Sequence, residues 1–168
     1  MKSVAQSLTI LALLAFAGCA SQSRVAVDQP VGPSRPHLAL HEGEGSLVVY
    51  SAPEITDQTG AYFPTHSPYA IYSLNGKLVE KVDNRTGSFD QEPVVVQLPL
   101  GEYRVHARAR NVGPVQVPVV IEENRTTVVH LDGRMQLDPA LRLGDKPVRL
   151  PDGQIVGESA QNAAALLP

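Results

Sequence analysis

Strict alternation between apolar and polar residues is the feature that most limits what this chain can fold into. In residues 102–110 every second residue is apolar, and the residues between them are Arg104, His106, Arg108 and Arg110. Residues 115–121 repeat the pattern with valine and isoleucine on the apolar side. Because successive side chains of a strand point to opposite faces, each stretch predicts a strand with one buried face.

Other short β-like runs surround these two stretches. Together they predict seven strands, at residues 46–52, 69–74, 77–82, 93–98, 102–110, 115–121 and 126–131. Asn75-Gly76 predicts a two-residue hairpin turn, because both residues tolerate positive φ. No long amphipathic helix lies between residues 46 and 133. We therefore expect an all-β fold, a single antiparallel seven-strand β-sandwich.

The order of these motifs resembles the PEGA and carboxypeptidase-regulatory-like domain families. The residues that resemble them are Gly45-Ser46-Leu47-Val48-Val49, Asn75-Gly76 and Leu98-Pro99-Leu100-Gly101-Glu102-Tyr103. The chain departs from the PEGA pattern in the long segment 51–68 and lacks the PEGA tetrapeptide. The resemblance implies an Ig-like or prealbumin-like Greek-key sandwich. It also implies a noncatalytic accessory module of an envelope or extracellular protein.

The first residues have the three parts of a secretory signal. Lys2 is followed by an almost wholly apolar run over residues 8–16 and by small residues before Cys19. This run is shorter than the ~20 residues that a membrane-spanning helix needs. An ordinary secretory signal is one interpretation of the segment.

The tetrapeptide Phe16-Ala17-Gly18-Cys19 also resembles the lipobox of bacterial lipoproteins, with Phe16 where that family usually has leucine. The resemblance implies cleavage before Cys19, acylation of its sulfur and new amine, and anchoring in a lipid bilayer of the cell envelope. Ala20 follows, where an aspartate would resemble the inner-membrane retention signal, so an outer-membrane location is favoured.

The sequence divides into four parts on this interpretation. Residues 1–18 are the signal peptide, and 19–45, rich in proline and glycine, form the lipidated cysteine and a disordered tether. Residues 46–133 form the β-sandwich domain. Residues 134–168 form an extension with a short helix at 138–143, a hairpin around Pro151-Asp152-Gly153 and an Ala-rich helix at 159–167.

Motifs for catalysis are scarce. The chain has one cysteine and lacks the nucleophile-elbow, P-loop, His-Glu-x-x-His and Cys-x-x-Cys motifs, so we expect no enzyme activity and no cofactor. A formal charge of −3 does not give the broad basic surface of a nucleic-acid-binding protein. His106 and His130 lie on different predicted strands, and they would hold a metal ion only if they shared a sheet face.

Two surfaces are candidate binding sites. The first is the basic row at Arg104, Arg108 and Arg110. The alternative interpretation of this row is an ordinary solvated strand face without a partner. The second is the long loop 51–68, in which Tyr62 and Phe63 are apolar anchors. The leading function is an interaction or assembly module with an envelope-protein or cell-wall partner. Peptidoglycan or glycan binding is an alternative that the low aromatic content disfavours, and a metal-dependent hydrolase is a third.

Overall fold

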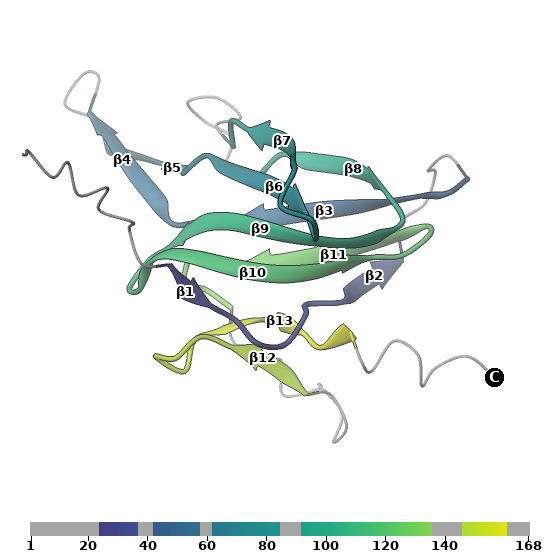
Figure 1. Cartoon of the computed structure of the whole chain (residues 1–168). Coiled ribbons are helices and arrows are strands. Elements are labelled where there is room, and N and C mark those ends of the chain that lie inside the picture. Colours follow the sequence, from purple (N-terminus) through teal and green to yellow (C-terminus); the bar gives the residue numbers. More distant parts are fainter. Residues whose placement is uncertain (1–23, 37–41, 58–61, 85–91, 136–145, 161–168) are drawn as a thin grey trace, which may run out of the picture.

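A computed structural model describes residues 24–36, 42–57, 62–84, 92–135 and 146–160. Within these ranges the protein is all-β, with thirteen strands and no α-helix (Figure 1). The strands are β1 (Val25–Ala26), β2 (Pro33–Pro36), β3 (Glu44–Tyr50), β4 (Pro53–Asp57), β5 (Tyr62–His66), β6 (Tyr69–Ser73), β7 (Leu78–Val82), β8 (Val95–Pro99), β9 (Gly101–Ala109), β10 (Gly113–Ile121), β11 (Arg125–His130), β12 (Pro147–Arg149) and β13 (Ile155–Glu158).

Two larger sheets share one hydrophobic core. The five-stranded sheet has the order β1-β10-β9-β6-β7, and the four-stranded sheet has the order β2-β11-β3-β8. Leu47 and Val49 from the smaller sheet belong to the same buried cluster as Ile71, Val105 and Val117 from the larger one. The apolar alternation seen in the sequence therefore supplies the facing surfaces of the two sheets (Figure 1).

Each of the seven predicted segments is a strand, forming β3 and β6 to β11. The prediction of one purely antiparallel seven-strand unit is not confirmed. The described chain has further strands, and β1 with β10 and β3 with β11 form parallel pairs, so the two sheets are mixed. Alternation shows which residues form a strand but does not specify its neighbours, which depend on chain crossings.

The prediction of a disordered tether over residues 19–45 is wrong for residues 24–36. β1 pairs with β10, the N–H of Val31 donates to the carbonyl of Pro118 (2.9 Å), and β2 pairs with β11. Val27 and Val31 are buried in the core. The prolines suit this edge position because an edge strand does not need every N–H for the ladder. Residues 19–23 and 37–41 of the predicted tether lie outside the described part of the structure.

The C-terminal hairpin β12–β13 covers this N-terminal segment. Val148, Leu150 and Val156 join the core, and the Gly32 N–H donates to the carbonyl of Glu158 (2.8 Å). Gly157 permits the close approach, since a Cβ atom there would lie 2.5 Å from Cγ1 of Val31. The helix predicted at 138–143 lies outside the described residues, as do residues 161–167 of the second predicted helix.

Two predicted connections differ in detail. The long loop predicted over 51–68 contains the antiparallel hairpin β4–β5, in which residues 58–61 are not described. At the β6–β7 turn only Gly76 has a positive φ (81°), while Oδ1 of Asn75 accepts a hydrogen bond from the Lys77 N–H (3.2 Å). The connection is therefore longer than a two-residue turn, since β6 ends at Ser73 and β7 begins at Leu78, and the Asn75 side chain stabilises it.

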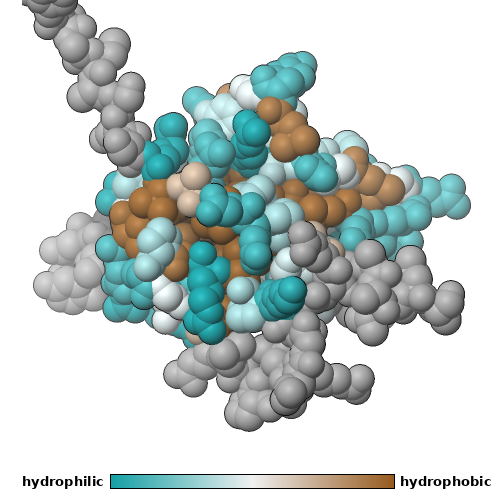
Figure 2. All heavy atoms as spheres, turned by 60° about the horizontal axis from the view of Figure 1, so that its bottom comes forward, coloured by the Kyte–Doolittle hydropathy of each residue, from teal (hydrophilic) through white to brown (hydrophobic). Residues whose placement is uncertain are grey.

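Apolar and polar residues both reach the surface of the domain. On the face that Figure 2 shows, apolar residues form a band across the described part of the chain, with polar residues around and between them. The exposed large apolar residues lie on edge strands and turns, at Leu74, Leu78, Val79, Val95 and Leu100.

Candidate functional site

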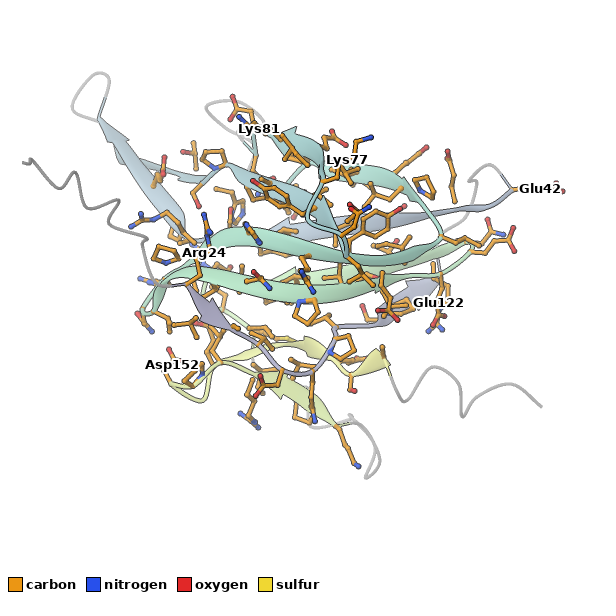
Figure 3. All side chains as sticks on the ribbon, viewed as in Figure 1. Arg24, Glu42, Lys77, Lys81, Glu122 and Asp152 are labelled. Carbon is orange, nitrogen blue, oxygen red and sulfur yellow. The ribbon has the colours of Figure 1, made fainter. Side chains whose placement is uncertain are left out.

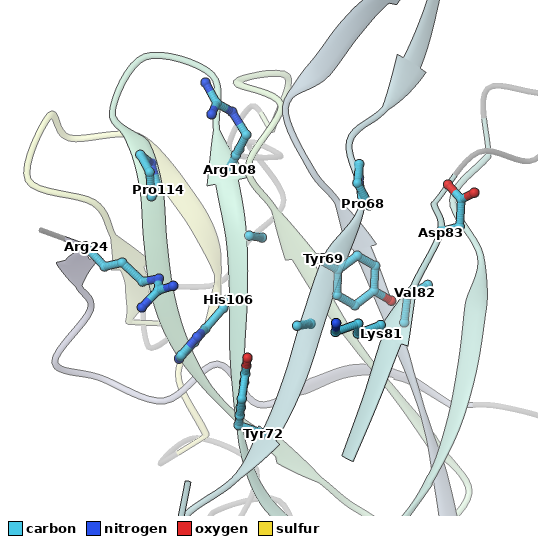
Figure 4. A pocket seen from close by; sticks show the side chains of 12 residues that line it. Arg24, Pro68, Tyr69, Tyr72, Lys81, Val82, Asp83, His106, Arg108 and Pro114 are labelled. Atoms are coloured by element: carbon cyan, nitrogen blue, oxygen red, sulfur yellow. The ribbon is translucent and has the colours of Figure 1, made fainter. Parts of the chain in front are cut away.

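A shallow groove of about 530 Å³ lies on the outer face of the five-stranded sheet. Its polar lining residues are Arg24, Tyr72, Lys81, Asp83, His106 and Arg108. Figure 4 shows Arg24 and Arg108 on one side and Lys81 and Asp83 on the other, with His106 and Tyr72 between them. We call this surface the cationic groove.

The strand register explains why the face is hollow. Ala70 on β6 lies opposite His106 on β9 and opposite Lys81 on β7. On the other side His106 lies opposite Gln116 on β10, which lies opposite Ala26 on β1. The small side chain of Ala70, between His106 and Lys81, leaves space between these longer side chains of the same row.

His106 occupies the centre of the groove. Its ring lies 4.3 Å from the ring of Tyr72, and its Nε2–H donates to Oε1 of Gln116 (3.1 Å). Burial lowers the pKa of His106 below the usual value, and the charges of Arg24 and Arg104 lower it further, against the effect of the Gln116 hydrogen bond. The imidazole is therefore neutral at pH 7, and it is held in a fixed orientation.

The charged groups of the groove are mostly cationic. Arg24, Lys81 and Arg108 come from three distant parts of the chain, and Asp83 is the carboxylate among the lining residues. Guanidinium groups bind carboxylates and phosphates through paired N–H donors, and an ammonium adds a compact charge. The arrangement is suited to an anionic group that approaches the face of the sheet.

Tyr69 lies beneath the groove with its hydroxyl buried. Among the described residues no donor or acceptor pairs with this hydroxyl. Burial raises the pKa of Tyr69 well above its usual value, and the charge of Glu80 acts in the same direction. Tyr69 therefore stays neutral and acts as part of the floor.

A second polar cluster lies on the outer face of the four-stranded sheet. The ring of Tyr50 stacks on His130 (4.7 Å) and meets the edge of His66 (5.6 Å), and its hydroxyl donates to Oε2 of Glu92 (3.1 Å). The Nδ1–H of His66 donates to the carbonyl of Ser51 (2.8 Å). These contacts are part of the packing that attaches the β4–β5 hairpin.

The hypothesis that His106 and His130 share a sheet face is wrong. His106 is on β9 of the larger sheet and His130 is on β11 of the smaller sheet, and the core lies between these sheets. Both point away from the core, because the residues that flank each of them are buried. Within the described ranges no group of three or more histidine, cysteine, aspartate or glutamate side chains is placed to hold a metal ion.

The basic row of the sequence lies on the outer face of β9 and just beyond its end. Arg104 is half-buried opposite Tyr72 and Pro118, while Arg108 and Arg110 are exposed. Arg108 lines the groove. Arg110 follows β9, where its N–H donates to the carbonyl of Leu131 (2.9 Å).

The remaining predicted site residues are described only in part. Tyr62 and Phe63 lie in β5 opposite Asp57 and Thr56, and their side chains lie outside the described part of the structure. Cys19 lies before the first described residue. The structure therefore leaves the predicted roles of these three residues as predictions.

Sequence reasoning missed Arg24, Tyr72 and Lys81. The sequence places Arg24 in the predicted tether, although Val25 and Val27 beside it have the spacing of a short strand. Tyr72 and Lys81 were placed on strands, but their position beside His106 depends on the order β9-β6-β7. No local motif specifies that order.

Comparison of the chain with protein-family models, with curated proteins and with solved structures finds no match. A search of the described residues for a helix long and apolar enough to span a bilayer is likewise negative.

Proposed function

We propose that this chain is a lipid-anchored envelope protein whose all-β domain is a noncatalytic interaction module. Its binding surface is the cationic groove, and its ligand presents an anionic group. The two larger sheets act as a β-sandwich scaffold of the kind that the PEGA-like and carboxypeptidase-regulatory-like resemblance implies. The outer face of one sheet recognises the ligand while the shared core fixes the strands.

The anchor in this proposal is Cys19, acylated after cleavage of residues 1–18, in the outer membrane where the organism has one. Each buried acyl CH₂ contributes about 0.8 kcal/mol to membrane binding, and more than one chain makes the attachment stable. The support is the lipobox-like tetrapeptide, which ends the long apolar run of the sequence.

The observation that supports the binding function most strongly is the convergence of charges in the groove. Arg24, Lys81 and Arg108 surround one hollow, although they come from three separate segments of the chain. A row of basic residues along a single strand is common on solvated surfaces. Cations gathered from three segments around a hollow and a neutral histidine instead suit a ligand anion.

Peptidoglycan or another acidic glycan is a second candidate ligand. The observation that favours it is the Tyr72 ring beside His106 in the groove, because an aromatic ring provides an apolar face next to the cations. The carboxylates of a glycan or its peptides would then meet Arg24 and Arg108.

Nuclear magnetic resonance titration of the mature chain, with Cys19→Ser to keep it soluble, tests the proposal. Glycerol phosphate and purified muropeptides are the two probes, added at low ionic strength. We expect concentration-dependent shifts of the amide signals of Ala70, His106 and Gln116 with at least one probe. The signal of Glu123, at the distant β10–β11 turn, serves as the internal control.

The double variant Arg24→Gln with Arg108→Gln should lose these shifts while its spectrum stays that of a folded protein. Shifts that are equally large at Glu123, or no shifts with either probe, would contradict the proposed binding surface.

A further inference from the structure

The groove lies close in sequence to the proposed anchor. Arg24, which lines it, is five residues after Cys19. Five fully extended residues span at most ~18 Å. If Cys19 is acylated, as the proposed function assumes, this edge of the groove cannot move further than that from the bilayer surface.

The end of the domain that includes Arg24 is rich in arginine. Asn111, in the β9–β10 turn, lines a second hollow with Arg149 and Gly133, and Arg110 packs beside Gly133. The arginines at this end are Arg24, Arg108, Arg110, Arg134 and Arg149.

Among the described residues, the acidic ones at the same end include Asp83, which lines the groove, and Glu92, whose Oε2 accepts from the Tyr50 hydroxyl. Asp132 is buried near Arg134 (3.9 Å), and Asp152 lies in the β12–β13 turn. Glu54 and Asp57 lie on the β4–β5 hairpin, which projects from the body of the domain (Figure 1).

The opposite end is acidic. Two hydrogen bonds join the β10–β11 turn to the start of β3. The Gly43 N–H donates to Oε1 of Glu123 (3.0 Å), and the Asn124 N–H donates to the carbonyl of Glu44 (3.1 Å). The glutamates gathered there are Glu42, Glu44, Glu102, Glu122 and Glu123. The described basic residues at this end are Arg125, which pairs with Glu122 (2.8 Å), Arg35, opposite Thr126, Lys77 in the β6–β7 turn and Lys146 before β12. Figure 3 shows Arg24 at one end of the domain and Glu42 and Glu122 at the other.

We propose that the Arg24 end docks on the anionic phospholipid headgroups of the membrane that holds the anchor. Headgroup phosphates then enter the cationic groove between Arg24, Lys81 and Arg108, and the glutamate end points away from the bilayer. This inference deepens the proposed function, because it rests on the lipid anchor and names the source of the anion.

Two physical effects favour the lipid over a soluble anion. A short link to the anchor keeps the local headgroup concentration high, so a weak contact is occupied for much of the time. Each basic residue near an anionic membrane also strengthens association about fivefold, provided that it lies within a Debye length of the surface. Repulsion of the glutamates disfavours the inverted orientation.

Vesicle cosedimentation of the mature chain, residues 19–168 with Cys19→Ser, tests the docking without a contribution from acyl chains. The probes are vesicles of phosphatidylcholine alone and of phosphatidylcholine mixed with phosphatidylglycerol, at low and high salt. We expect binding that requires phosphatidylglycerol and decreases with salt. Arg24→Gln with Arg108→Gln should lower the partition coefficient about 25-fold, and the corresponding glutamate pair should lower it further.

The matched control is Lys77→Glu with Lys146→Glu, which changes net charge by the same amount as the glutamate pair. Lys77 lies at the β6–β7 turn and Lys146 precedes β12, and both are exposed and outside the groove. This control should retain most of the binding. Circular dichroism and the thermal transition identify any variant that does not fold. If the glutamate pair does not fold, the comparison with wild type uses the milder glutamine pair.

No phosphatidylglycerol-dependent binding, or an equal loss in the control, overturns the inference. Binding to isolated sacculi but not to vesicles also overturns it, because the anion would then belong to the cell wall. In that case the muropeptide titration of the groove would still succeed, so the proposed interaction function would stand. Failure of both experiments removes both proposals.

Discussion

Replacing Val31 by alanine tests whether the N-terminal segment is part of the folded domain. Val31 is 0% exposed, its N–H donates to Pro118, and its carbonyl accepts from the Val120 N–H (2.9 Å). The substitution removes two buried methyl groups, at about 0.8 kcal/mol each, and leaves a cavity. We expect the free energy of unfolding to fall by roughly 2–3 kcal/mol. In a domain of this size that corresponds to a decrease in Tm of roughly 5–10 °C.

Urea unfolding of the mature chain, followed by circular dichroism, measures this loss. Val95→Ala is the matched control, because it makes the same chemical change at a side chain that is 52% exposed on the edge strand β8. The control should cost less than about 0.5 kcal/mol. Equal stabilities of the two variants would refute the reasoning and show that residues 24–36 are the tether that the sequence suggested.

Three further predictions concern buried and titrating groups. Asn84→Ala should lower the free energy of unfolding by about 2–4 kcal/mol, since Asn84 donates to Val49 (2.8 Å) and accepts from the Val94 N–H (2.9 Å); a neutral effect in urea unfolding would contradict these bonds. Tyr69→Phe should leave Tm unchanged or raise it, because the lost hydroxyl has no partner among the described residues, and a clear decrease would show that it has one. The affinity of the groove for an anion should increase as pH falls below ~6.5, the usual pKa of histidine. The reason is that the pKa of His106 is lowered in the free protein, whereas a bound anion raises it, so binding takes up a proton. His106→Gln should abolish this dependence in calorimetric titrations, and a wild-type affinity that is flat with pH would contradict it.

The strands were predictable from the sequence wherever one face is buried. Apolar and polar residues alternate along β9 and β10, because one face of each strand meets the core and the other meets water. This period of two is visible in the sequence of residues 102–121. The β12–β13 turn was equally local, since Gly153 has a positive φ (88°) that glycine tolerates.

The partners of each strand were not predictable. Residues 24–36 are rich in proline and short of alternation; Val27 and Val31 are buried in the core and Val25 packs against it. Their strand conformation depends on β10, β11 and β13, which come about a hundred residues later in the chain. Only part of the groove was predictable from the sequence, for the same reason. Arg108 and His106 lie on one strand, whereas Arg24 and Lys81 join them only through the order of the sheet.

Photocrosslinking in cells tests the central claim most directly, because it identifies what occupies the groove. A photoreactive residue at Ala70 samples the groove between His106 and Lys81, and one at Leu100, in the distant β8–β9 turn, is the control. Mass spectrometry of the products, in wild type and in Cys19→Ala, would identify any captured phospholipid, muropeptide or protein. The account predicts capture of an anionic species at Ala70, dependent on Cys19 and absent at Leu100. Capture at neither position, or the same products at both, would contradict it.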